Sequence, residues 1–341
     1  MKQKHYTHMS REERHVFSAY LQDGLSLRAV ALKLGRQPGG LCREIKENSR
    51  DGNRTGYDPA FADLHARFRK WDANRRNPLK SREVMEYVLE KLRKDWSPVQ
   101  IAGRIQEDHP GSPDMRVSHE TVYRFINSEE GRELNVVSHL RHGKYRKFKK
   151  KRPIPLHPKK QAIPNRISID ERPSIVQKKK RFGDWEGDSM IGRLTRGEIL
   201  TVQKERKSQY IRLKKVKDKS AAETSRAICE NLTSFPASLR RTMTFDNGRE
   251  NTEHGQLSIA LGLEIYFCDP YSSWQKGSVE NIIGLIRQYI PKGERLENYS
   301  DGQIQAIEDR LNDRPRKCLG FRTPREVLSK HLKRLGVQLP V

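Results

Sequence analysis

Long apolar stretches are missing from this 341-residue sequence. No apolar run approaches the roughly 18 residues that a membrane-spanning helix needs, so we expect no membrane contact. Residues 1–15 are charged throughout and contain no hydrophobic segment, which argues against a secretory signal.

Cysteine is also scarce. The four cysteines are far apart and no two form a CxxC pair, which argues against a zinc site and a disulfide framework. A reducing cytoplasm suits such cysteine use, and we therefore expect a cytoplasmic protein.

Acidic residues are few in relation to basic ones. Lys and Arg number 68 against 43 Asp and Glu, which gives a formal net charge of +25. Such an excess points to a polyanionic partner, usually DNA or RNA, although a protein with a merely basic, soluble surface is the plain alternative. The length predicts two or three domains, each large enough to bury a core.

The segment 1–50 has the pattern of short consecutive helices. Ser10-Arg-Glu-Glu13 is a capping box, Ser26 caps a second helix, and Gly35 suits the left-handed position after it. A third helix is expected near 38–47. This spacing predicts a helix-turn-helix DNA-binding unit, with an ordinary three-helix unit as the alternative.

The next segments are a helical connector over 51–80 and a second helical pair over 81–140. In the pair, Ser97-Pro98 begins one helix and Ser118 caps the other. We interpret 81–140 as a second helix-turn-helix-like DNA-binding unit.

A basic segment follows at 141–183. Residues 141–160 contain ten Lys or Arg and no acid, and several prolines come after them. Such a run is predicted to stay extended as a linker until it meets phosphates, unless it is only a solvated tether. The phosphate contacts expected here are Lys149, Lys150, Lys151 and Arg152.

From residue 184 the hydrophobic period changes to that of short strands. Strands are predicted over 184–191, 199–203, 210–216, 242–245 and 263–267, with helices between and after the last of them. This order predicts an α/β layered domain over 184–330.

Three carboxylates in that domain could carry metal-dependent chemistry. Asp188 lies near the end of the first strand, Asp246 follows the fourth, and Glu280 begins a helix. Clustered carboxylates repel and need protons or cations, and oxygen ligands suit Mg²⁺ or Mn²⁺. The alternatives are a turn at Asp246-Asn-Gly248 and a helix-start role for Glu280.

Several ordered motifs resemble one known family, the transposases of the insertion-sequence-30 family. In the second half they are Trp185-Glu-Gly-Asp188, Thr244-Phe-Asp-Asn-Gly-Arg-Glu250 and Asp269-Pro-Tyr-Ser-Ser-Trp-Gln-Lys-Gly-Ser-Val-Glu-Asn281. In the first half they are Trp96-Ser-Pro98 and Ser118-His-Glu-Thr-Val-Tyr123. The 33 residues between Asp246 and Glu280 match the DDE spacing of that family.

This resemblance implies all-α helix-turn-helix units followed by an RNase H-like (retroviral integrase) catalytic core. It implies that Asp188, Asp246 and Glu280 bind Mg²⁺, for which Mn²⁺ should substitute, with Asp188 bridging two ions. It also implies a bacterial, nucleoid-associated enzyme that binds double-stranded DNA, both its terminal inverted repeats and its target, as a homo-oligomer. The expected reaction is phosphodiester cleavage and strand transfer.

The chain departs from the family pattern at a few positions. Asp184 stands where a His is usual. On a strand, Asp184, Glu186 and Asp188 share one face, so the site could be unusually acidic. The alternative is that Asp184 and Glu186 form a solvated strand start. Val279 replaces a polar residue, which indicates a better packed helix. Gly39 and Gly40 weaken the third helix, which we expect to be short or to order only on DNA.

Further DNA contacts are expected from long polar side chains in these units. Those near the predicted carboxylates are Lys276, Arg287 and Lys292, with a plain basic surface as the alternative. Those in the two helical units are Arg36, Gln37, Arg43, His119 and Arg124.

Two other functions compete with a transposase. A DNA-binding regulator could keep the fold without the chemistry, and a nuclease could cut without joining strands. The presence of all three acids favours an enzyme over a regulator, and only strand-transfer products would separate a transposase from a nuclease.

Overall fold

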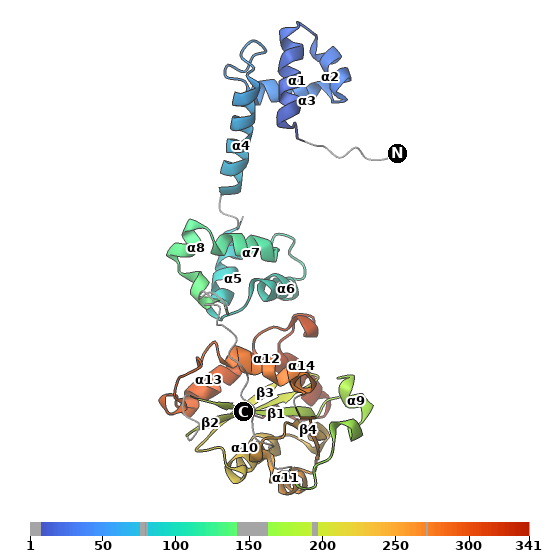
Figure 1. Cartoon of the computed structure of the whole chain (residues 1–341), viewed down its shortest axis with the longest axis vertical. Coiled ribbons are helices and arrows are strands. Elements are labelled where there is room, and N and C mark those ends of the chain that lie inside the picture. The colour runs from blue at the N-terminus through green and yellow to red at the C-terminus, as the bar shows by residue number, and fades with distance from the viewer. Residues whose placement is uncertain are drawn as a thin grey trace. The chain divides into compact units, whose positions relative to one another are not determined.

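The computed structural model describes residues 8–75, 79, 81–141, 163–192, 197–270 and 272–340. The chain divides into two compact units, Met1–Pro78 and Leu79–Val341, which are described separately (Figure 1).

The first unit is a group of helices around a small core. The capping box of Ser10 and Glu13 is present, and Gly35 ends the second helix with φ 63°, as expected. Phe17, Val30 and Leu41 are completely buried in its core. The helices are α1 (Arg11–Gln22), α2 (Leu27–Leu34), α3 (Pro38–Asn48) and α4 (Pro59–Arg75).

The expectation that the third helix is short or ordered only on DNA is wrong. The helix α3 has 11 residues despite its two glycines. Each glycine costs about 1 kcal/mol relative to Ala. Burial of Leu41 and Ile45, worth about 1.5–3 kcal/mol per side chain, offsets that cost.

The second unit begins with another helical group, residues 79–141. Ser97 and Gln100 form the capping box expected at the start of α6, and Ser118 caps α7. Ile101, Val122 and Phe125 are completely buried in its core. Its elements are α5 (Arg82–Arg93), α6 (Pro98–Asp108), α7 (His119–Ile126), α8 (Glu129–Glu133) and the 3-10 helix η1 (Val136–His139).

This helical group is bonded to the C-terminal part of the chain. The Arg104 guanidinium bridges both carboxylate oxygens of Glu326 at 2.6 and 2.7 Å. Gln100 donates to the carbonyl of Pro315 at 2.8 Å, and Gln288 donates to that of His139 at 3.0 Å. Residues 79–141 therefore pack as part of the second unit.

The segment expected to be an extended linker is packed in its second half. Residues 142–162, and with them Lys149 to Arg152, lie outside the described residues. Beyond them, η2 (Ile169–Glu171) packs against β5, and Val176 of α9 (Ser174–Gln177) is completely buried. The reason is backbone pairing: the N–H of Phe267 donates to the carbonyl of Ile167 at 2.9 Å.

A five-stranded mixed sheet forms the centre of the second unit. The strand order is β3-β2-β1-β4-β5, antiparallel among β1 to β3 and parallel among β1, β4 and β5. This is the arrangement expected of an RNase H-like sheet, and the α/β fold predicted for this region is confirmed. The strands are β1 (Asp184–Ile191), β2 (Ile199–Glu205), β3 (Ile211–Val216), β4 (Thr242–Phe245) and β5 (Glu264–Phe267).

Helices cover both faces of this sheet (Figure 1). On one face lie α10 (Ala221–Thr233) and α11 (His254–Leu261), and on the other lie α12 (Gly277–Ile286) and α13 (Asp301–Asn312). The last helix, α14 (Pro324–Arg334), adds Leu328 and Leu332 to the first of these clusters. The short 3-10 helices are η3 (Ala237–Leu239), η4 (Arg249–Asn251), η5 (Ser273–Lys276), η6 (Leu296–Asn298) and η7 (Lys317–Leu319).

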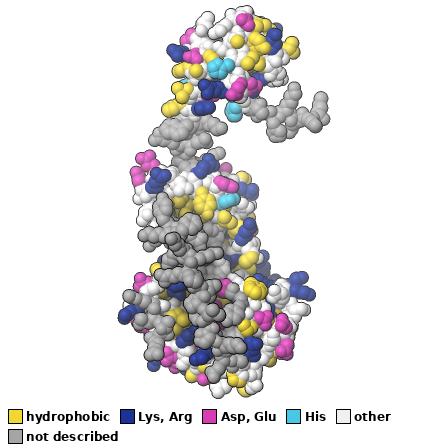
Figure 2. All heavy atoms as spheres, viewed as in Figure 1, with side chains coloured by type: hydrophobic (Ala, Val, Ile, Leu, Met, Phe, Trp, Pro, Cys, Tyr) yellow, Lys and Arg dark blue, Asp and Glu magenta, His cyan; other side chains and the backbone are white. Residues whose placement is uncertain are grey.

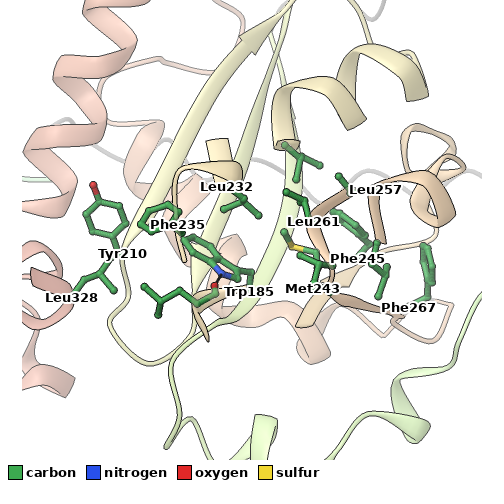
Figure 3. Close-up of a cluster of buried hydrophobic side chains, with 14 of the residues drawn as sticks. Trp185, Tyr210, Leu232, Phe235, Met243, Phe245, Leu257, Leu261, Phe267 and Leu328 are labelled. Carbon is green, nitrogen blue, oxygen red and sulfur yellow. Dashed lines mark hydrogen bonds between the residues drawn. The ribbon is translucent and has the colours of Figure 1, made fainter. Parts of the chain in front are cut away.

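Trp185 of β1 lies in the core between the sheet and α10 (Figure 3). Its ring centroid is 5.5 Å from that of Phe235, and its indole N–H donates to the carbonyl of Leu239 at 2.7 Å. A buried Trp whose polar atom is satisfied holds β1 rigidly, and β1 carries Asp188. In the part of the chain that the structure describes, no helix is both long and apolar enough to span a bilayer.

Candidate active site and DNA-binding surfaces

Asp188 of β1 and Asp246, the residue that follows β4, lie near each other where the parallel pairing of these two strands ends. The β1–β4 ladder ends with the pair Glu186 and Thr244, and Asp188 and Asp246 each come two residues after that pair. Polar residues at this carboxyl edge of parallel strands face the crevice where α/β sheets usually bind ligands. The Asp188 side chain is mostly buried, at 18% exposure, whereas that of Asp246 is 49% exposed.

A buried lysine lies between these two carboxylates. The Lys276 Nζ is 3.5 Å from Asp188 Oδ2 and 3.9 Å from Asp246 Oδ2, and it donates to the carbonyl of Gly187 at 3.1 Å. Only 4% of Lys276 is exposed. The sequence predicted a surface contact to DNA for this residue, or else a solvated basic face, but the structure buries it.

Backbone and amide donors orient both aspartates. The N–H of Ser189 donates to Asp188 Oδ1 at 2.8 Å, and those of Gly248 and the Asn251 side chain reach Asp246 Oδ1 at 3.2 Å. Burial raises the pKa of the Asp188 carboxyl, the Lys276 ammonium opposes that change, and the negative charge of Asp246 adds to it. A nearby positive charge therefore stabilises the ionised form of Asp188 against the cost of its burial.

The third predicted acid, Glu280, does not join them. It lies in the first turn of α12 with an exposed side chain, while Val279 beside it is completely buried. Over the described residues, no three His, Cys, Asp or Glu side chains come close enough together to hold a metal ion. The burial of Val279 confirms the better packed helix face, and the metal triad stays a prediction.

The residues present nevertheless suit a divalent cation. Asp188 and Asp246 offer the hard oxygen donors that Mg²⁺ and Mn²⁺ prefer, and they already surround one positive charge. Glu280 lies in the first turn of α12, and Lys276 is the N-cap of that helix.

The idea that Asp184 and Glu186 form a solvated strand start is wrong. Asp184 is completely buried and pairs with Arg181 at 2.9 Å. Glu186 is 1% exposed, pairs with Arg206, and accepts the N–H of Val279 at 3.0 Å. Helices cover both faces of β1, so acids there need internal partners.

Sequence reasoning missed the basic members of this buried network. Lys204 of β2 donates from Nζ to the Ser278 hydroxyl at 2.7 Å and to its carbonyl at 3.1 Å, and burial lowers the pKa of Lys204 to about 8. Together with Arg206 it connects the end of β2 to the start of α12. A lysine and an arginine at a strand end carried no signal that distinguished them from surface residues.

The predicted DNA contacts differ in how accessible they are. Gln37, Arg43, His119, Arg124 and Lys292 are exposed. Arg36 is already bound to Glu13, through contacts as short as 2.8 Å. Arg287 is half-buried and donates to the carbonyl of Ile191 at 2.7 Å. On the face that Figure 2 shows, Lys and Arg side chains lie among Asp and Glu side chains over both units.

Comparison with known proteins decides the family. A family model described as a helix-turn-helix domain matches residues 5–48. The transposase of IS1086 from Cupriavidus metallidurans is 36% identical over 340 residues, 98% of each chain. The InsI transposase of IS30A from Escherichia coli K12 is 33% identical over 334 residues, 95% of this chain and 84% of InsI. The chain belongs to the IS30 family of transposases.

A solved structure is similar as well. The catalytic core domain of BIV integrase, at 22% identity and a TM-score of 0.33, covers 45% of this transposase and 98% of its own chain. Family membership confirms the predicted enzyme class, a DDE transposase with a helix-turn-helix region, and DNA as its partner.

Proposed function

We propose that this IS30-family transposase binds the terminal inverted repeats of its own insertion sequence, cleaves DNA at their ends and joins those ends to target DNA. The observation that carries the proposal is the convergence of Asp188 and Asp246 on one buried cation. An edge of two parallel strands that concentrates two carboxylates around positive charge suits phosphodiester chemistry.

In this proposal Asp188, Asp246 and Glu280 hold Mg²⁺, or Mn²⁺ in its place. When bound, divalent metal supplies positive charge at the phosphodiester and at the leaving oxygen. The chain's own donors orient the ligands: Ser189 N–H fixes one carboxylate oxygen of Asp188, and Asn251 fixes one of Asp246. The exposed side of Asp246 leaves room for the DNA strand.

We further propose that DNA binding is divided among the segments. Residues 1–50 and 81–140, which the connector 51–80 joins, would bind the repeats. The contacts would come from exposed side chains, those of Gln37, Arg43, His119 and Arg124. The linker 141–183 would bind phosphates through Lys149 to Arg152, and 184–330 would carry the chemistry. Lys292, exposed near α12, suits a phosphate contact, whereas Arg36 and Arg287 would first have to leave their internal partners.

Two DNA ends must be paired before they are joined, so we propose a homo-oligomer on DNA in the bacterial cytoplasm, associated with the nucleoid. Water would be the nucleophile in the first cut, and a DNA 3′-hydroxyl would be the nucleophile when the strands are joined.

A plasmid assay tests the proposed reaction. Supercoiled plasmid that carries the flanking repeats is incubated with Mg²⁺ and either wild type or the triple Asp188→Ala, Asp246→Ala, Glu280→Ala variant. We expect joined ends or insertions from the wild type alone. Cuts without joining would indicate a nuclease, and specific binding without any cut by either protein would indicate a regulator.

A further inference from the structure

Among the residues that the structure describes, Lys276 is the one basic residue that forms ion pairs with both Asp188 and Asp246. Its ammonium faces three oxygen atoms: Asp188 Oδ2 and the carbonyl oxygen of Gly187 on β1, and Asp246 Oδ2 just after β4. Such an all-oxygen environment suits a metal ion as well as an ammonium. The side chain therefore occupies the position where the two aspartates concentrate negative charge.

The backbone around Lys276 ties this contact to the position of Glu280. Lys276 ends η5 and is the N-cap of α12, and Glu280 follows within the first turn of that helix. On the other side, the backbone N–H of Asp269 donates to Gln275 Oε1, and Gln275 Nε2 donates to Asp269 Oδ2, each at 2.8 Å. With the ammonium between the aspartates, the start of α12 is anchored and Glu280 remains exposed.

We propose that Lys276 is an internal counter-ion that divalent metal must displace. In the metal-free protein its ammonium neutralises Asp188 and Asp246. Metal binding would expel it, release the start of α12, and allow Glu280 to complete the ligand set. The inference rests on the proposed function, because it takes Asp188 and Asp246 as ligands.

The direct test is a Mn²⁺ titration of the full-length protein, with free Mn²⁺ measured by electron paramagnetic resonance. Lys276→Met should bind Mn²⁺ about tenfold more tightly than wild type, since an opposite charge at this distance changes the affinity of a carboxylate for a cation by at least that factor. Lys217→Met removes an exposed lysine that directly follows β3 and should leave the affinity unchanged. Equal or weaker binding by Lys276→Met would overturn the proposal.

Loss of a buried charge could also unfold the protein, so a second variant and a second measurement are needed. Lys276→Gln keeps a donor for Gly187 and should show the same tighter binding. In thermal unfolding without metal, both variants should melt below wild type, and Mn²⁺ should raise their melting temperatures more than that of wild type. Equal shifts in all proteins would contradict displacement.

Trp274 reports on the movement of η5. Its side chain is 75% exposed two residues before Lys276. Saturation with Mg²⁺ should change its fluorescence in wild type, obtained as the difference from Trp274→Phe, but not in Asp188→Asn. An unchanged Trp274 signal with bound Mg²⁺ would rule out the release of α12.

The outcomes separate the two proposals. If wild type and the double Asp188→Asn, Asp246→Asn variant bind Mn²⁺ equally, the proposed metal site itself is wrong. If only the double variant loses binding while Lys276→Met binds like wild type, the site stands and the counter-ion role of Lys276 falls.

Discussion

At the scale of single residues, buried ion pairs are the feature of the sheet whose loss should cost the most stability. Glu186 and Arg206 form an ion pair, and neither side chain is more than 3% exposed. Removing one member of such a pair leaves an uncompensated charge in a low-dielectric interior, whereas replacing both with apolar groups is often tolerated.

Arg206→Met should therefore lower the free energy of unfolding by about 3–5 kcal/mol. The double Arg206→Met, Glu186→Leu variant should recover most of that loss. Urea unfolding measures both. Arg226→Ala, which removes two ion pairs on the surface of α10, serves as the control that should barely change stability. A single variant as stable as wild type would show that Arg206 is dispensable.

The buried Lys204 should make the free energy of unfolding vary with pH in the alkaline range. Its pKa is lowered to about 8 in the folded protein, so above that pH the unfolded chain binds more protons than the folded one. Stability should then rise with pH between about 8 and 10, by at most about 1.4 kcal/mol per pH unit, relative to Lys204→Met. Chemical unfolding of both proteins across this range measures the difference, and parallel pH profiles would contradict it.

At the scale of elements, local sequence rules and packing disagree in α3. Its glycines disfavour a helix, yet buried Leu41 and Ile45 hold the helix in place. Gly35 differs from them, because its φ of +63° is a conformation that other residues rarely adopt.

Gly39→Ala should stabilise the first unit by up to about 1 kcal/mol, since a Cβ there meets no atom within 4 Å and Ala favours the helix. Gly35→Ala, the matched control at the C-cap of α2, should destabilise it, because its positive φ is strained for Ala. Thermal unfolding of the full chain measures both. A Gly39→Ala variant that melts below wild type, or a Gly35→Ala variant that melts above it, would contradict this account of the two glycines.

The β1–β4 pairing is the element that builds the candidate site. Asp188 and Asp246 were identified from motifs about 60 residues apart in the sequence. Their proximity follows from the parallel register, and the buried Lys276 between them follows from the way α12 begins against β1.

At the scale of the whole molecule, the 68 Lys and Arg residues overstate the number of basic side chains available to DNA. Arg14, Arg104, Arg206 and Arg212 are bound to acids inside the protein. The affinity for DNA should therefore reflect a limited set of phosphate contacts rather than the total charge.

With about eight phosphates neutralised, the logarithm of the DNA association constant should fall with the logarithm of salt concentration with a slope of about −7. Replacing Lys149, Lys150, Lys151 and Arg152 by Ala should reduce that slope by about 3 to 4 units. Fluorescence anisotropy over a salt series measures it. Asp188→Asn should keep the wild-type slope, and a quadruple variant with an unchanged slope would remove the linker from the interface.

Much of this protein could be predicted locally. Capping at Ser10, Ser97 and Ser118, the strand periods after residue 184 and the family motifs depend on neighbours in the chain, and they predicted the helices, the α/β sheet and the family. The motifs also singled out the two acids that the fold brings together.

What the tertiary structure alone decided is the environment of charge. Whether Asp184, Glu186 and Lys276 face solvent or the interior depends on helices that arrive from distant parts of the chain, and no local pattern encodes that. The packed second half of the predicted linker has the same origin, because its backbone pairs with β5, about 100 residues further on. The sequence thus determines which charged groups are present, and tertiary burial determines which of them form ion pairs with one another.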